Sequence, residues 1–98
     1  MMTPTEIEQR VRQFVLTSFL VDTPPEAFQN SDDLFLLLDS LQILRLVVQL
    51  ESMFGVKVQQ PELTADNLSS VEKVAAFMVR KGAGGRLSPV SMQRGKRA

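Results

Sequence analysis

Hydrophobic side chains recur at helical spacing in three stretches of the chain. The first stretch opens with Thr3-Pro4-Thr5-Glu6, in which Thr3 can cap a helix, Pro4 takes the first helical position and Glu6 completes a capping box. The apolar positions that follow are Ile7, Val11, Phe14, Val15, Leu16 and Phe19. Because proline cannot continue a helix, the sequence predicts that this first helix ends before Thr23-Pro24-Pro25.

A second helix is predicted from about Ser40 to Phe54, a stretch without glycine or proline that is followed by Gly55 as a stop. Its apolar side chains form two rows. The row with the spacing of a core stripe is Ile43, Leu46, Val47, Leu50 and Phe54. The row on roughly the opposite face is Leu41, Leu44 and Val48, which Arg45 joins. Either the helix is buried all round, or this second row is an exposed docking patch; we favour the patch, because so small a bundle rarely buries a whole helix.

A last helix is predicted from a second capping signature, Ser69-Ser70-Val71-Glu72, with Ser69 as the cap and Glu72 three residues later. The apolar stripe of this helix is Val71, Val74, Ala75 and Met78. Gly82-Ala83-Gly84-Gly85 ends the helix. Between the second and last helices, the stretch from Pro61 to Asn67 has room for one short helical turn.

These elements predict an all-α fold, a small four-helix bundle of three main helices and one short helix. Residues 22–38 are expected to form a long first loop that contains Ser31, Asp32 and Asp33. Loops of this length are uncommon in compact domains and are often functional. Val56-Lys57-Val58 alternates like a strand but has no partner strand in the sequence, so no sheet is expected.

The distribution of charge divides the chain into two regions. The formal net charge is zero, but residues 82–98 carry Arg86, Arg94, Lys96 and Arg97 and no acidic residue, so their charge is +4 and that of residues 1–81 is −4. We therefore expect a folded domain over residues 1–81 and a basic, disordered tail over residues 82–98. A nucleic-acid or membrane-surface binder working through this tail is an alternative, but a solvated tail is the simpler interpretation.

The composition excludes several kinds of chemistry. The chain has no cysteine and no histidine, which excludes disulfides, Cys/His zinc sites, a cysteine nucleophile and any triad that needs an imidazole. We expect no enzyme, no metal and no nucleic-acid partner. The first 20 residues include charged side chains, and the densest apolar run, Leu34 to Leu38, is five residues, so we expect no signal peptide, no membrane span and a cytoplasmic location.

Asp39-Ser40-Leu41 stands at the start of the second helix. A serine hydroxyl at that position can cap the helix, or it can be presented to solvent at the positive end of the helix dipole, where a phosphate group is favoured. Taken alone, the tripeptide is common by chance, and the cap is the better interpretation.

Three segments together resemble an acyl carrier protein over residues 3–81: Asp39-Ser40-Leu41, the run from Leu50 to Val56, and the run from Ser70 to Val74. The resemblance implies that Ser40, flanked by Asp39 and Leu41, carries 4′-phosphopantetheine through a phosphodiester and that the arm's thiol holds cargo as a thioester. A cofactor of this kind explains how a chain without cysteine or histidine takes part in acyl chemistry. The family fold is a four-helix bundle with a long first loop.

The same resemblance implies the partners of the chain. They are a phosphopantetheinyl transferase and the enzymes that load and use the acyl or aminoacyl cargo, and the surface offered to them is Leu41, Leu44, Arg45 and Val48. No second copy is implied, so we expect a monomer. The expected function is that of a carrier in lipid or specialised-metabolite synthesis, fatty acid biosynthesis included.

The sequence departs from common fatty-acid carriers in ways that bear on its partners and cargo. Leu37 stands where a glycine is usual, and Arg45 and Gln42 stand where acidic residues are usual. The stretch from Pro61 to Leu68 looks more like the D-alanyl and other aminoacyl carriers. An aminoacyl carrier therefore remains an alternative, as does an unmodified helical protein-interaction module.

Overall fold

The computed structural model describes residues 2–83, which form helices and no strand. The α-helices are α1 (Pro4–Ser18), α2 (Leu34–Leu37), α3 (Ser40–Phe54), α4 (Ala65–Leu68) and α5 (Val71–Arg80), and the 3-10 helices are η1 (Pro25–Ala27) and η2 (Gln60–Glu62). The all-α bundle is confirmed. Its three long helices are those predicted, and α4 with η2 supplies the short helical segment between the second and the last.

α1 begins where its capping residues predicted, with Thr3 as the N-cap. The hydroxyl of Thr3 accepts a hydrogen bond from the backbone N–H of Glu6 at 3.1 Å, and the Glu6 carboxylate accepts one from the N–H of Thr3 at 2.8 Å. This reciprocal pair is the predicted capping box. Ile7, Val11 and Val15 are fully buried, so the predicted stripe of α1 faces the core.

The predicted bounds of α3 are confirmed at both ends. Gly55 follows the helix in the left-handed conformation, with a φ of 65°, and its N–H donates to the carbonyl of Glu51 at 3.0 Å. A residue with a Cβ rarely adopts this conformation, which is why glycine stops the helix here. The core row is confirmed as well: Leu46, Val47, Leu50 and Phe54 are buried, and Ile43 is half-buried against them.

The predicted cap of the last helix was wrong by one residue. The N-cap of α5 is Ser70, whose side chain accepts a hydrogen bond from the N–H of Lys73 at 3.1 Å. Ser69 cannot take that place because it ends α4, where its N–H donates to the carbonyl of Ala65. The stripe predicted for this helix, Val71, Val74, Ala75 and Met78, is buried.

The long first loop is more ordered than predicted, because it contains η1 and α2. Arg12 of α1 holds it in place: its guanidinium donates to Asn30 Oδ1 at 2.8 Å and to the carbonyl of Pro25, and lies over the ring of Phe28, 5.2 Å from its centre. Leu34 and Leu38, which bracket α2, are buried in the core. These anchors fix where the chain enters α3.

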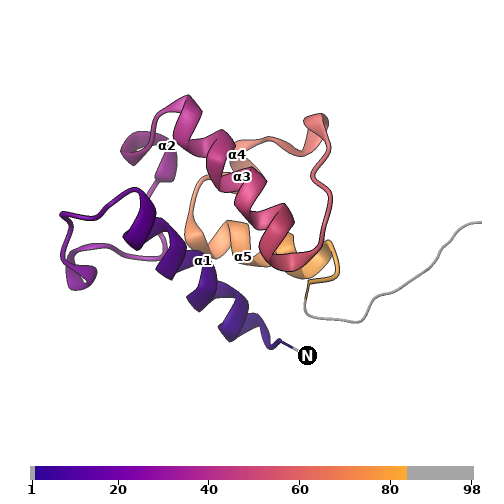
Figure 1. Ribbon diagram of the computed structural model, residues 1–98, viewed down its shortest axis with the longest axis horizontal. Helices are drawn as coiled ribbons and strands as arrows, with labels where there is room; N and C mark the ends of the chain where they lie inside the picture. The colour runs from indigo at the N-terminus through magenta and orange to yellow at the C-terminus, as the bar shows by residue number, and fades with distance from the viewer. Residues whose placement is uncertain (1, 84–98) are drawn as a thin grey trace, which may run out of the picture.

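The arrangement of the long helices places the start of α3 at one end of the bundle. α1 packs along α5, and α4 packs against α5 (Figure 1). α3 begins beside α2 and, in this view, runs in nearly the opposite direction to α1, with α5 at an angle to both (Figure 1). Within residues 2–83, no helix combines the length and the apolarity that crossing a membrane requires.

Candidate functional site

Ser40 is the first residue of α3, but it does not cap the helix. The N-cap is Asp39, whose carboxylate accepts a hydrogen bond from the N–H of Gln42 at 2.8 Å, while the Gln42 side chain accepts one from the N–H of Asp39 at 3.0 Å. The interpretation of Ser40 as the cap was therefore wrong. Asp39 is extended and its carboxylate meets the first-turn donor, whereas Ser40 is already helical.

The hydroxyl of Ser40 is left accessible for chemistry. Ser40 is exposed, and within residues 2–83 its Oγ forms no hydrogen bond. A negative group placed on this oxygen would lie at the positive end of the helix dipole, which favours it by about 0.3–1 kcal/mol at an exposed site. The chain has no histidine, and the neighbouring carboxylate of Asp39 is engaged in the cap.

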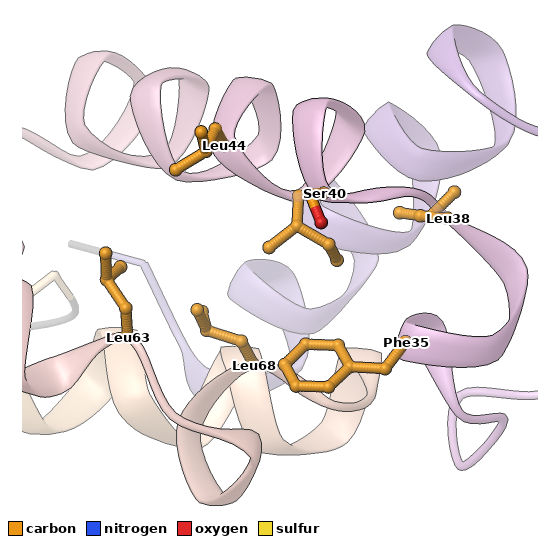
Figure 2. Close-up of a pocket in the computed structure, with 7 residues that line it drawn as sticks. Phe35, Leu38, Ser40, Leu44, Leu63 and Leu68 are labelled. Carbon is orange, nitrogen blue, oxygen red and sulfur yellow. The ribbon is translucent and has the colours of Figure 1, made fainter.

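An apolar pocket of about 430 Å³ lies beside Ser40. Its lining residues come from α2, α3, α4 and the segments that join them, and Ser40 is the polar member among them: Phe35, Leu38, Ser40, Ile43, Leu44, Leu63 and Leu68. Figure 2 shows Phe35, Leu63 and Leu68 on one side of the space, facing Ser40 and Leu44 on the other. Phe35 and Leu63 remain partly exposed, so the pocket is open to solvent.

Most of this pocket was not found by sequence reasoning. The run from Leu34 to Leu38 was noticed only as the densest apolar stretch, and Leu63 and Leu68 carried no signal of their own. Helical periodicity could have placed Leu44 and Ile43 on neighbouring faces of α3. It could not have shown that α2 and α4 face them.

The second apolar row of α3 is exposed. Leu41, Leu44 and Val48 are 60%, 52% and 63% exposed, which excludes the alternative that α3 is buried all round. Arg45 lies among them, and the row borders a hollow of about 500 Å³ that continues onto Phe14 and Phe19 at α1. Neither Asp39 nor Glu51 forms an ion pair with Arg45 within the described part of the chain.

A polar cluster holds the far wall of the pocket. Lys81 pairs with the Glu62 carboxylate at 2.9 Å, and Arg80 donates to Asn67 Oδ1 at 2.7 Å, which ties η2 and α4 to the end of α5. A hydrogen bond from the backbone N–H of Gln59 and the ion pair with Lys81 lower the pKa of Glu62. The segment held in this way carries Leu63 and Leu68 into the pocket.

A comparison of the sequence with models of known protein families bears on the role of this site. Residues 16–78 match the family model described as the phosphopantetheine attachment site, a range that covers more than half of the chain and includes Ser40 and the whole pocket. The chain belongs to the phosphopantetheine attachment site family. Members of this family are non-catalytic carriers that bear a covalently attached 4′-phosphopantetheine, and they interact with phosphopantetheinyl transferases and acyl-handling enzymes. No curated protein matches the chain at a significant level.

The family match confirms the resemblance, the helical fold, the carrier role and the cofactor expected from the sequence. The residues at the start of α3 fit such a cofactor, because they combine an accessible hydroxyl, a helix N-terminus and an adjoining apolar pocket. The predicted basic tail, residues 82–98, lies almost wholly outside the described residues, which end at Ala83. Gly82, with a φ of 98°, stands just past the end of α5, as predicted.

Proposed function

We propose that Ser40 is the attachment residue for 4′-phosphopantetheine. The observation that carries the proposal is the position of its free, exposed hydroxyl on the first turn of α3, at the edge of the apolar pocket. The matched range holds five other serines, Ser18, Ser31, Ser52, Ser69 and Ser70. None of them lines this pocket, and the only other one at the start of a long helix, Ser70, is buried and caps α5.

In the proposed transfer, Ser40 Oγ forms a bond to the pantetheine-bearing phosphorus of coenzyme A, the P–O bond of the diphosphate breaks, and adenosine 3′,5′-bisphosphate leaves. The transferase supplies the base that takes the proton of the hydroxyl. Asp39 keeps the first turn of α3 intact while the hydroxyl reacts, because the cap does not involve Ser40. The dipole of α3 favours the negative charge that the product places on the first turn. When bound, the group supplies the thiol that holds the cargo as a thioester.

We further propose that the cargo is an acyl group rather than an aminoacyl group. Six of the seven residues that line the pocket are apolar, and the seventh is Ser40 itself. An apolar chain gains free energy on leaving water for such a surface, whereas an ammonium group would find no charged partner there. The aminoacyl alternative is supported by the likeness of Pro61 to Leu68 to D-alanyl carriers.

The proposed setting is the cytoplasm, where a monomer would present its cargo to enzymes of lipid or specialised-metabolite synthesis. The proposed contact surface for these enzymes is the exposed row of α3 together with Arg45. Asp39 and Leu41 flank the proposed attachment residue. An unmodified interaction module is the weaker alternative, because the family consists of cofactor carriers.

The attachment residue can be tested by intact mass after incubation with coenzyme A and a phosphopantetheinyl transferase. We expect the wild type to gain one phosphopantetheine and Ser40→Ala to gain none. Ser52→Ala is the matched control, because Ser52 is an exposed serine of the same helix, and this variant should gain the full mass. A modified Ser40→Ala variant, or a wild type that no transferase modifies, would overturn the proposal.

The class of cargo can be tested on the loaded protein by NMR. Loading with a medium-length acyl group should shift the methyl signals of Leu63 and Leu68, and loading with alanine should not. The methyl signals of Val21, an exposed residue outside the pocket, should stay in place in both cases. Equal shifts with the two cargoes would favour the aminoacyl alternative.

A further inference from the structure

Three consecutive apolar side chains on α2 face solvent. Leu36 is 84% exposed, the highest fraction among the large hydrophobic residues of the described chain, and Phe35 and Leu37 are exposed to a lesser degree. The residues on either side, Leu34 and Leu38, are buried and anchor the short helix. The packing of the bundle accounts for the anchors, and Phe35 lines the pocket beside Ser40, which leaves Leu36 and Leu37 without a role in the packing of the described residues.

The exposed leucines of α2 lie within reach of any enzyme that acts on Ser40. Leu37 precedes Ser40 by three residues, so the two Cα atoms are separated by no more than roughly 11 Å, and those of Leu36 and Ser40 by roughly 14 Å. A standard protein interface covers about 800 Å² on each partner, equivalent to a disc about 16 Å in radius. An enzyme centred on Ser40 would therefore cover both leucines of α2, together with Leu41 and Leu44 of α3.

The same surface carries little net charge. α2 itself carries no charge, but the exposed residue Asp33 precedes it and Asp39 stands between Leu38 and α3, while the charged residues of α3 are one base, Arg45, and one acid, Glu51. The Glu51 carboxylate accepts a hydrogen bond from Val58 near the other end of the helix. Asp33 and Asp39 are the acidic residues beside α2 and Ser40, and Arg45 offsets one of their two charges, so the net charge of these three residues is −1. A surface with so little net charge steers a charged partner weakly and complements an uncharged, apolar one.

We propose that the phosphopantetheinyl transferase that loads this chain recognises it through an apolar hollow that receives Leu36 and Leu37. We call Leu36, Leu37, Leu41 and Leu44 the leucine collar. The inference rests on the proposed attachment at Ser40 and adds that recognition depends on α2, not on α3 alone, and on apolar burial, not on charge. The collar comprises exposed leucines on both sides of Ser40 in the sequence, two on α2 and two on α3, so docking on it would bring the hydroxyl of Ser40 to the transferase active site.

The test compares the kinetics of modification for three variants of the full chain, using the transferase of the source organism and coenzyme A. Leu36→Ser should lower kcat/KM by about tenfold or more, mainly through KM, because the lost contact is apolar burial in the partner and not contact with the reacting atoms. Leu36→Met keeps an apolar side chain and should stay near the wild type. Val21→Ser is the matched control, since Val21 is 68% exposed but lies on the turn after α1.

A second arm varies salt. Because docking is apolar, kcat/KM of the wild type should change by no more than about twofold between about 0.05 M and 0.5 M salt, a range over which exposed charges become largely screened. A steep fall with salt would show docking by charge and overturn the inference.

Equal kinetics for Leu36→Ser, Val21→Ser and the wild type would also overturn it, while attachment at Ser40 would stand. A wild type that is never modified would instead refute the attachment at Ser40, and the inference with it. Circular dichroism of each variant checks that the fold is intact, which we expect because Leu36 and Val21 are exposed.

Discussion

At the residue scale, Asp39 and Ser40 have different roles at the start of α3. The Asp39 carboxylate accepts a hydrogen bond from a backbone N–H of the first turn, whereas the Ser40 hydroxyl stays free next to the pocket. A serine that capped the helix would have its oxygen committed to a backbone N–H, and a group attached there would disturb the cap. If Ser40 is the attachment residue, as we propose, the hydroxyl can be modified without loss of the hydrogen bonds at the helix end.

This division predicts different stabilities for two neighbouring alanine variants. Asp39→Ala should lower the free energy of unfolding by about 0.5–2 kcal/mol, because it removes the cap. Ser40→Ala should change it little, since Ser40 Oγ makes no hydrogen bond within residues 2–83. Urea unfolding monitored by circular dichroism measures both. Equal losses for the two variants would mean that the hydroxyl contributes to the cap after all.

Arg45 gives a second prediction at this scale. Enzymes that act on acidic carriers are expected to present basic residues to α3, and Arg45 would place like charge against them. With both proteins carrying the cofactor, Arg45→Glu should be a better substrate than the wild type for a fatty-acid synthase enzyme. The gain should come from faster association and shrink as salt is added. Equal use of the two proteins at low salt would show that Arg45 does not set specificity.

At the scale of elements, the pocket depends on two short helices, α2 and α4, that are held in place by tertiary contacts. α2 is held by its buried ends, Leu34 and Leu38, and the η2–α4 segment is held by the polar contacts between Glu62 and Lys81 and between Asn67 and Arg80. A four-residue helix has no stability of its own, so these tertiary contacts are what keep the pocket walls in place.

The ion pair of Glu62 predicts a dependence of stability on pH. The pKa of Glu62 is lowered in the folded protein, so its carboxylate stabilises the fold above the ordinary pKa of glutamate, and that contribution disappears as pH falls through the lowered value. Glu62→Gln should therefore be less stable than the wild type at neutral pH, and the difference should shrink in acid. Lys81→Gln should show a smaller difference of the same sign, because the hydrogen bond from the backbone N–H of Gln59, the larger cause of the lowered pKa of Glu62, remains. A difference that stays constant or grows below about pH 4 would contradict the assignment.

At the scale of the whole molecule, the buried hydrophobic side chains of the described residues run from Ile7 to Met78. This core joins α1, α3 and α5 with the anchors of α2 and α4. The sequence of residues 84–98 offers little apolar periodicity with which to join it. We therefore propose that the folded domain is residues 1–81, with the basic tail as an appendage.

Removal of residues 84–98 should accordingly leave the melting temperature nearly unchanged. Leu50→Ala provides the contrast, because Leu50 is fully buried and its truncation should lower the free energy of unfolding by about 2–5 kcal/mol. Calorimetry of the wild type and both variants makes the comparison. A large fall in melting temperature on truncation would show that the tail packs on the domain.

The sequence by itself determined the features that depend on local hydrogen bonds. The capping box of Thr3 and Glu6, the stop at Gly55 and the core stripes of the long helices involve partners within a few residues or one face of one helix, so their pattern is legible along the chain. Asp39-Ser40-Leu41 also pointed to the carrier family, although the choice between Asp39 and Ser40 as the cap needed backbone angles.

Only the tertiary structure decided which surfaces meet. Ser69 and Ser70 each have a hydroxyl that could cap α5. Ser70 is the cap because Ser69 is already the last residue of the turn that ends α4. The exposure of Leu36 and Leu41 and the pocket formed by Phe35 and Leu63 depend on elements distant in sequence that pack together. Burial is a property of the assembled bundle, and no local pattern records it, because the same apolar side chain can face the core or solvent according to what lies across from it.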